Sequence, residues 1–257
     1  MLKTVPLKNK PLCILEHNGD IYIGDARGTI YLLQAPYDRP RAIETAASPV
    51  SALAFHHRLY YGTWDGVVCF GERSRGLGSD MVKAMTVWRG RVFVSVDLKL
   101  FVLDLDLNIL EEHDTESKIY CICTHKDRLI FGMGHGLVST YADEYSTATK
   151  SAHDASILAM ADGLSGCTYG RLMRGGDIVF ASDQWIRSIF DAGLFSCGKS
   201  VMVDMKAIYS HSDDVVGVLR IGNRVISIGL DFCYKIHEDG VGLAEDEERE
   251  LLDMLNS

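Results

Sequence analysis

The sharpest chemical pattern in this sequence lies between Gly193 and Ser200, which read GLFSCGKS. The run matches the phosphate-loop pattern G-x-x-x-x-G-K-[ST], in which backbone N–H groups surround phosphate oxygens. In such a loop Gly193 and Gly198 allow the close turn, Lys199 neutralises the phosphates and Ser200 holds magnesium. A phosphate loop also needs a helix directly after it. The residues after Ser200, VMVDMKAIYS, alternate like a strand, so a polar turn between outer strands is the favoured interpretation and nucleotide binding the alternative.

A second set of residues, His211, Ser227 and Asp231, has the side chains of an acid–base or nucleophilic triad. His153 with Asp154 raises the same question. The sequence has no Gly-x-Ser-x-Gly turn, which would present a nucleophilic serine. We therefore predict that these histidines brace the fold and that the chain has no catalytic residue.

Metal chemistry is the third possibility, because the chain has nine histidines and seven cysteines. A zinc site needs three or four ligands at suitable spacing. His56 and His57 are adjacent, so on a strand they point to opposite faces. The nearest cysteines fall in other expected strands, and we predict neither a metal site nor a cofactor.

The elements that position these residues belong to a repeat. Six segments share an apolar strand, a tight turn and a further apolar strand, at intervals of about forty residues. They superpose on a column of mostly small residues: Gly24, Gly62, Ser95, Gly132, Ala181 and Ile228. A plausible inner strand precedes each segment, from PLCILEH at Pro11 to VVGVLRI after Asp214. One such sheet cannot bury both of its faces, so the units must pack against one another around an axis.

The pattern resembles the WD-repeat family, in which a histidine precedes each inner strand and an aspartate lies in the turn before the third strand. His211 and Asp231 occupy these positions, with Ser227 at the usual hydroxyl. His153 precedes SILAMA in the same way, and His113 stands before KIYCI after a slightly longer gap. Other units depart from the pattern, with Leu98, His135 and Gln184 at the turn position and Trp64-Asp65 out of frame.

The resemblance implies an all-β propeller, and the six repeated segments predict six blades over residues 1–240. Seven blades would need about 37 residues each, and no seventh small-residue turn is visible in the sequence. The resemblance also implies ring closure, with Leu2–Pro6 supplying the outer strand of the last blade. Residues 162–176 are then a Gly-rich insertion within the fifth blade. Residues 192–212 are a long connection that contains an outer strand near Val201–Tyr209. Residues 241–257 form an acidic tail, expected as a short amphipathic helix with Leu251 and Leu255 on one side. That tail is either a solvated appendage or a segment that docks on the disc or on a partner.

Composition narrows the function classes. The net charge is −9, which opposes direct binding of nucleic acid because phosphate neutralisation needs a basic surface. The N-terminal residues lack the apolar stretch of a signal peptide, and no run is long enough to span a membrane. Seven cysteines without a Cys-x-x-Cys pair suit a reducing compartment, so we expect a cytoplasmic or nuclear protein.

The candidate binding residues are those expected on one rim of the disc. Trp64 and Trp185 are expected at or beside the turns between second and third strands, as are Arg27 and His135. Exposed tryptophan and arginine on one face are typical of binding hot spots, although each ring could instead fold back on its own blade. We predict a protein–protein interaction scaffold, monomeric on its own, that serves as a subunit or adaptor of a larger complex. The alternative is a hydrolase with polar groups in the central channel.

Overall fold

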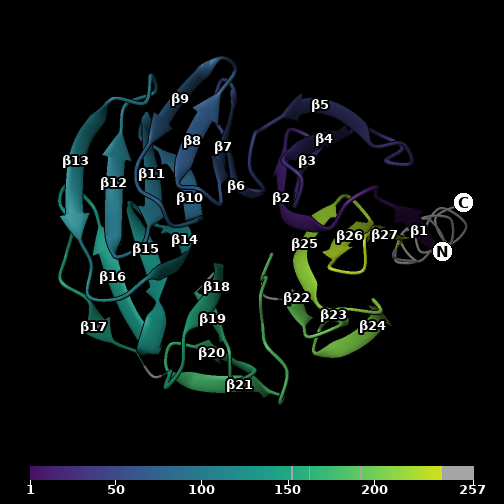
Figure 1. Ribbon diagram of the computed structural model, residues 1–257. Coiled ribbons are helices and arrows are strands. Elements are labelled where there is room, and N and C mark those ends of the chain that lie inside the picture. The colour runs from purple at the N-terminus through teal and green to yellow at the C-terminus, as the bar shows by residue number, and fades with distance from the viewer. Residues whose placement is uncertain (152, 162, 192, 239–257) are drawn as a thin grey trace, which may run out of the picture.

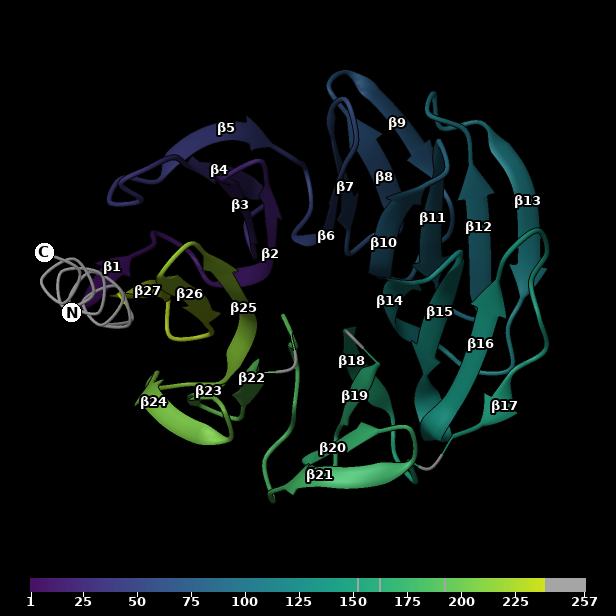
Figure 2. The ribbon, with the colours of Figure 1, turned by 180° about the vertical axis from the view of Figure 1, so that it is seen from behind.

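Short antiparallel strands fill the computed structural model, which describes residues 1–151, 153–161, 163–191 and 193–238. The strands form seven separate sheets that stand around a common axis (Figure 1). The same ring of sheets is seen from behind in Figure 2. Six of the sheets have four strands and one has three.

Blades 1 to 4 each consist of four consecutive strands, with the first strand nearest the axis (Figure 1). Blade 1 contains β2 (Pro11–His17), β3 (Asp20–Asp25), β4 (Thr29–Leu33) and β5 (Arg41–Thr45). Blade 2 contains β6 (Val50–Phe55), β7 (Leu59–Thr63), β8 (Val67–Phe70) and β9 (Arg73–Gly76). Blade 3 contains β10 (Val82–Trp88), β11 (Arg91–Val96), β12 (Lys99–Leu103) and β13 (Ile109–Asp114). Blade 4 contains β14 (Ile119–His125), β15 (Arg128–Met133), β16 (Leu137–Tyr141) and β17 (Thr149–Lys150), with the 3-10 turn η1 (Gly134–Gly136) between β15 and β16.

Blades 5 to 7 complete the ring. Blade 5 contains β18 (Ile157–Ala161), β19 (Leu164–Cys167), β20 (Arg171–Arg174) and β21 (Asp177–Ala181). Blade 6 contains β22 (Leu194–Cys197), β23 (Ser200–Val203) and β24 (Lys206–Ser210). Blade 7 contains β25 (Val215–Ile221), β26 (Arg224–Gly229) and β27 (Cys233–Glu238), and its outer strand is β1 (Leu2–Pro6). The N-terminal strand thus closes the ring as predicted, paired antiparallel with β27 from Leu2 opposite His237 to Pro6 opposite Cys233.

The prediction of six blades is wrong, because the expected fifth unit contains two. The Gly-rich residues 162–176, expected as an insertion, contain β19, the turn after it and β20. Asp177–Ala181 is the outer strand of blade 5 and not its second strand. Residues 192–212, expected as a connection, contain the strands of blade 6.

The seventh blade also corrects the column of small residues. In blades 5 and 6 the small-residue column is formed by Gly166 and Ser196. They take the place of Ala181, which was expected in the column of a single fifth blade. The residues of the column are small because each of them faces the start of the next blade. A Cβ on Gly166, for example, would lie 2.4 Å from Ile186 Cγ2, and one on Gly62 would lie 2.4 Å from Val82 Cγ1. Close packing between successive blades therefore explains the repeat that the sequence shows.

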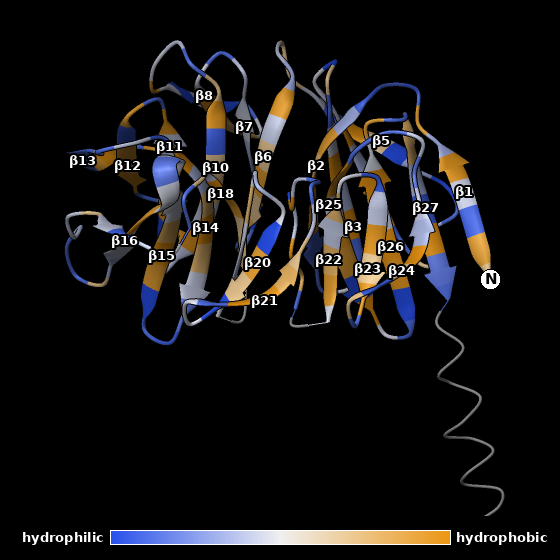
Figure 3. Ribbon diagram, turned by 90° about the horizontal axis from the view of Figure 1, so that it is seen from below, coloured by the Kyte–Doolittle hydropathy of each residue, from blue (hydrophilic) through white to orange (hydrophobic). Residues whose placement is uncertain are grey.

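The core is a set of apolar clusters between neighbouring blades. Val68 and Phe70 of blade 2 pack with Val92 and Phe101 of blade 3, and comparable clusters join blades 1 and 2, 3 and 4, 5 and 6, 6 and 7, and 7 and 1. Seen from the edge of the disc, the apolar segments run along the strands between two more hydrophilic rims (Figure 3). Because each sheet is covered on both faces, the blades are stable only as a ring.

All seven cysteines are described, and none forms a disulfide bond. No helix among the described residues is long and apolar enough to cross a membrane. The expected amphipathic helix with Leu251 and Leu255 lies outside the described residues.

Candidate functional site

The inner strands share a local irregularity at one end of the central channel. In six blades the pairing between the first and second strands skips the second residue of the inner strand. Such a β-bulge leaves one residue outside the ladder and re-aims its side chain. The skipped residues are Leu12, Ser51, Lys83, Tyr120, Leu158 and Val216. The bulge thus repeats around the axis and turns one side chain of each of these blades toward the channel.

Blade 6 contributes to the same level of the channel without a regular inner strand. The segment from Ile186 to Phe190 runs beside β22, with the Ser196 N–H donating to the Ser188 carbonyl at 2.9 Å. Ile186 is fully buried, like the first residues of the other inner strands, and Arg187 follows it. Arg187 and the six bulged residues form a seven-membered set that we call the collar.

The collar surrounds a hollow of about 420 Å³, which we call the channel mouth. Every collar residue lines it, and Trp64, Met81, Val82, Trp185 and Leu230 complete its wall. A pocket of this size falls within the ~300–1,000 Å³ range of small-ligand and side-chain sites. The mouth therefore offers a concave, mostly apolar site built by all seven blades.

Two tryptophans far apart in the sequence meet at the channel mouth. Trp64 lies in the turn between β7 and β8, where its N–H donates to the Pro49 carbonyl at 3.0 Å, and its side chain is 47% exposed. Trp185 is 44% exposed and lies beside the turn between β22 and β23, since its carbonyl accepts the Gly198 N–H at 2.9 Å. Trp185 immediately precedes the inner segment of blade 6. Gln184, which was expected in a turn between second and third strands, therefore also lies before that segment.

The charged side chains that line the mouth are both cationic. The Arg187 guanidinium stacks on the Trp185 ring at 4.4 Å and pairs with the Asp214 carboxylate at 3.2 Å. Lys83 is half-buried, and its burial lowers the pKa of the ammonium below its usual range. Nearby, Lys118 bridges Asp80 and Asp97 and holds the pKa of the Asp80 carboxyl low.

The channel continues beyond the mouth as a second cavity of about 410 Å³. It shares Leu12, Ser51 and Val216 with the mouth, and its remaining wall is largely apolar. The carboxylate on its lining is that of Glu16, which accepts the Gly19 N–H at 2.7 Å and so holds a turn. The converging acidic groups that the hydrolase hypothesis requires are not assembled here by the described residues.

The turns between second and third strands form the outer part of the same face. Arg27 is exposed between β3 and β4, and His135 is exposed in η1 between β15 and β16. Neither lines the channel mouth, so the four residues expected together on the rim fall into an inner pair and an outer pair. Tyr169, 60% exposed in the turn between β19 and β20, belongs to the outer group and was missed because its turn was expected to be an insertion.

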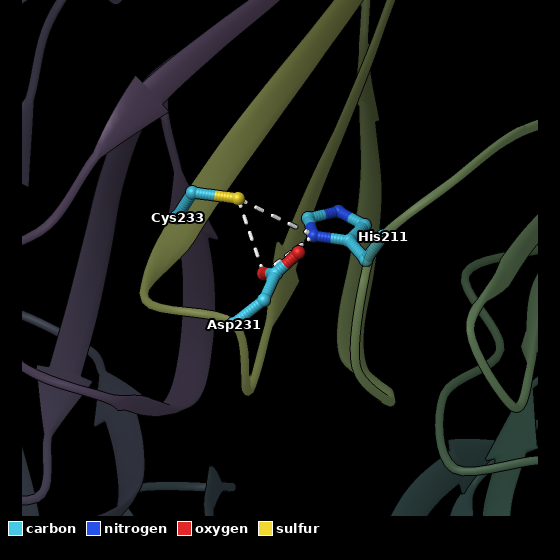
Figure 4. Close-up of side chains that lie close together, drawn as sticks. All are labelled: His211, Asp231 and Cys233. Carbon is cyan, nitrogen blue, oxygen red and sulfur yellow. Dashed lines mark hydrogen bonds and ion pairs between the residues drawn. The ribbon is translucent and has the colours of Figure 1, made fainter.

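His211, Ser227 and Asp231 do come together in blade 7. Figure 4 shows His211 and Asp231 with the neighbouring Cys233. The His211 imidazole contacts Asp231 Oδ1 through Nδ1 at 2.9 Å and Ser227 Oγ through Nε2 at 2.8 Å. The Tyr209 hydroxyl lies 2.9 Å from the same Ser227 oxygen, and the Cys233 thiol donates to Asp231 Oδ1 at 3.1 Å. The three predicted residues are therefore linked in one buried chain of hydrogen bonds, extended at its two ends by Tyr209 and Cys233.

The pKa shifts in this network indicate a neutral imidazole beside a charged carboxylate. Burial lowers the pKa of His211, although its hydrogen bond to Asp231 opposes the shift. Burial alone would raise the pKa of Asp231, but the hydrogen bonds from His211, Cys233 and Ser212 outweigh it and bring the pKa to about 2. At neutral pH His211 thus donates its Nδ1 proton to the Asp231 carboxylate.

His211, Asp231 and Cys233 are also the one group of described residues with three metal-ligating atoms within 4.8 Å of one another. A metal would need Cys233 as a thiolate. Burial and the neighbouring carboxylate raise the pKa of that thiol to about 12, so binding a metal would have to displace its proton. Hydrogen bonds link the three side chains in this arrangement. The nearest cysteines were expected in other strands, and the closeness of Cys233 to His211 was not predicted.

The other histidines matched to the repeat differ from His211. His153 Nε2 lies 2.8 Å from Ser165 Oγ, but the turn of its blade has no aspartate and Nδ1 is buried without a hydrogen-bond partner among the described atoms. His113 lies in the outer strand β13 and contacts Glu111 at 3.0 Å, so it does not precede an inner strand as the pattern requires. Blade 7 alone, among the blades described, combines the histidine, serine and aspartate.

The phosphate-loop match folds as a β-hairpin. Leu194–Cys197 is the buried strand β22, Gly198 and Lys199 form the turn, and Ser200 begins β23. The Lys199 ammonium donates to the Ser212 carbonyl at 2.9 Å, and the Gly193 N–H donates to Asp191 at 2.8 Å. A second strand thus stands where a phosphate loop has its helix, and the turn joins the second and third strands of blade 6 and not two outer strands.

Comparisons with known proteins show likeness in fold. No protein-family model and no curated protein sequence matches the chain. The WD40 propeller domain of Doa1 matches 91% of the chain and 95% of that domain, at 10% identity and a TM-score of 0.75. U3-55K matches 91% of the chain and 97% of its own, at 12% identity and a TM-score of 0.75. The WD40 repeats of RRP9 match 91% and 96%, at 11% identity and a TM-score of 0.72. The resemblance to WD-repeat proteins is therefore confirmed for the fold: the chain is folded as a β-propeller of the WD40 kind.

Proposed function

We propose that this protein is a non-catalytic interaction scaffold, a subunit or adaptor of a larger complex, that binds a partner protein at the channel mouth. The observation that supports this proposal is that Trp64 and Trp185 line the same hollow. Almost half of the surface of each residue is exposed. Tryptophan is enriched among the residues that supply most binding energy in protein interfaces. An apolar hollow between two such residues is the kind of surface that marks an interaction site.

Among the described residues, the wall of the channel is mostly apolar, and this supports a scaffold over a hydrolase with converging carboxylates. Asp80 and Asp231, carboxylates on this side of the disc with lowered pKa values, are held by Lys118 and His211. Neither belongs to the wall of the channel mouth. Free thiols at all seven cysteines suit a cytoplasmic or nuclear location, which is part of the proposal, as is a monomeric state of the isolated chain.

Affinity capture with variants tests the proposal. The tagged full chain and a Trp64→Ala/Trp185→Ala variant are compared for a stoichiometric partner recovered from the source cells. We expect the double variant to lose the partner, because truncating a central tryptophan costs about 2 kcal/mol or more in an interface. Leu110→Ala is the matched control, since Leu110 is 49% exposed but lies on the outer strand β13. Equal recovery by all three proteins would exclude the channel mouth as the binding site.

A further inference from the structure

The channel mouth has hydrogen-bond donors that lack acceptors. Lys83 and Tyr120 occupy neighbouring collar positions, on the inner strands of blades 3 and 4. Within the described part of the chain, neither the Lys83 ammonium nor the Tyr120 hydroxyl forms a hydrogen bond. The described residues that line the mouth include no carboxylate. The two groups are therefore placed to donate to an acceptor that comes from outside.

The environment of Lys83 favours an anionic acceptor. The ammonium is half-buried and has lost part of its hydration. The Asp80 carboxylate attracts it but is directly paired with Lys118, so Lys83 gains no direct ion pair within the described residues. Arg187, the other cation of the collar, is already paired with Asp214. A carboxylate beside Lys83 would replace the lost hydration with a charge-assisted hydrogen bond.

The rest of the mouth is suited to apolar side chains. Met81 and the Trp64 ring lie on the same side of the mouth as Lys83, because the second strand of blade 2 packs against the start of β10. The opposite side of the mouth is lined by Leu158, Trp185 and Val216, from blades 5, 6 and 7. A ligand that fills the hollow would therefore bury apolar surface on both sides of its charged group.

The surroundings disfavour a polyanion. Asp65 follows Trp64, Asp80 precedes Met81, and Asp183 and Asp214 lie just before the inner segments of blades 6 and 7. Together with the net charge of −9, these carboxylates repel a chain of phosphates. A single negative charge can still bind beside the Lys83 ammonium.

We propose that the channel mouth binds a linear segment of a partner protein in which one aspartate or glutamate is flanked by large apolar residues. The carboxylate accepts hydrogen bonds from Lys83 and Tyr120, and the apolar side chains pack against Trp64 and Trp185. The inference rests on the proposed function and adds the chemistry of the partner.

Peptide selection on the full chain tests the proposal. A phage-displayed library of random linear peptides is selected on the protein, and clones that also bind Trp64→Ala are discarded. The tightest remaining peptide is synthesised with its acidic residue and with the matching amide. We expect selected sequences to contain an acidic residue between apolar ones, and Lys83→Met to weaken binding of the acidic peptide roughly tenfold. Lys83→Arg should stay within about threefold of the parent, and the amide peptide should bind the parent and Lys83→Met equally.

The control and the contrary outcomes are specific. Lys99→Met removes a lysine of the same blade that is paired with Glu112 and Asp114 and does not line the mouth, and it should leave peptide affinity unchanged. Mouth-dependent peptides that lack an acidic residue, or that bind Lys83→Met unchanged, would overturn the inference while leaving the proposed function intact. Tighter Lys83-dependent binding of a uridine 20-mer than of any peptide would overturn it in favour of nucleic acid. If neither peptides nor the captured partner depend on Trp64, the inference and the proposed function both fail.

Discussion

Individual side chains in this propeller divide into those that hold blades together and those left without a structural task. Ser227 belongs to the first kind, because its buried hydroxyl joins His211 to Tyr209. Lys83 belongs to the second, because it stands in the wall of a hollow without a hydrogen-bond partner among the described residues. The difference lies in satisfied polar contacts, and it separates a structural network from a candidate binding residue.

Ser227→Ala tests the structural network. Removing the hydroxyl leaves the buried groups of His211 and Tyr209 without this partner, so we expect a loss of about 1–3 kcal/mol in the free energy of unfolding. Ser200→Ala is the control, because that hydroxyl contacts only Ser210 near the surface and should change stability by less than about 0.5 kcal/mol. Denaturant unfolding measures both variants, and equal losses would show that the network adds no stability.

The buried histidines predict a fall in stability at mildly acidic pH. Burial lowers the pKa of both His153 and His211 from 6.5, so below that pH the unfolded chain takes up protons that the folded chain does not. The stability contributed by the neutral rings is complete above pH 6.5 and is lost as the pH falls toward their folded values. Asp231 adds a further loss at lower pH, between its ordinary value of 3.8 and about 2.

Urea unfolding between pH 7.5 and 5 measures this effect. We expect the unfolding free energy to fall with pH in the parent and to fall less steeply in His153→Gln, which removes one of the two buried rings. Unfolding that is as stable at pH 5 as at pH 7.5 in the parent would contradict the assignment of neutral histidines.

At the scale of elements, ring closure depends on a strand with little apolar surface. Most of β1 is exposed, yet all of it pairs with β27, from Cys233 to His237, and Leu7 after it is buried between blades 7 and 1. The strand therefore acts through its backbone hydrogen bonds and through the connection that it makes between the ends of the chain.

Deleting residues 1–6 tests this closure. We expect a loss of about 2 kcal/mol, or roughly 5 °C in Tm, because several ladder hydrogen bonds disappear while the interblade clusters remain. A chain that ends at Gly240 is the matched truncation, and the domain boundary expected from the sequence predicts no change in its Tm. An unchanged Tm after removal of residues 1–6 would show that β1 is dispensable.

Sequence patterns were sufficient for β1 and for the first three strands of blades 1 to 4 and 7, because those strands are rich in β-branched and aromatic residues and follow the repeat. They failed at blades 5 and 6. The strands β19 and β20 have four residues each, and the inner segment of blade 6 is irregular, so neither has a recognisable period. Gly166 and Ser196, which continue the small-residue column, stood outside the expected strands for that reason. The rhythm of the column, more regular with them than without, was the signal that could have identified the seventh blade.

The candidate site was predictable only in part, for a related reason. Trp64 and Trp185 could be singled out by residue type, but Lys83, Tyr120 and Arg187 are ordinary members of inner strands in sequence. Their common position depends on a bulge that recurs in six blades and on the count of blades around the axis. Both are properties of the assembled ring, which no single repeat contains.

For the whole molecule, the closed ring turns seven weak local features into one site. Each blade places a single side chain at the collar, and residues from position 12 to position 230 line the same hollow. Because blades stabilise one another, the hollow exists only when the ring is closed. We therefore expect a partner to bind the channel mouth as a whole and not any one blade.

Site-specific photo-crosslinking tests this claim most directly. A photoreactive phenylalanine derivative is placed in turn at positions 64, 185 and 110 of the full chain, and crosslinked partners are identified by mass spectrometry. The account predicts that positions 64 and 185, from blades 2 and 6, crosslink to the same segment of the same partner, whereas position 110 on the outer strand β13 does not. Crosslinks from position 110 alone, or from positions 64 and 185 to unrelated proteins, would contradict it.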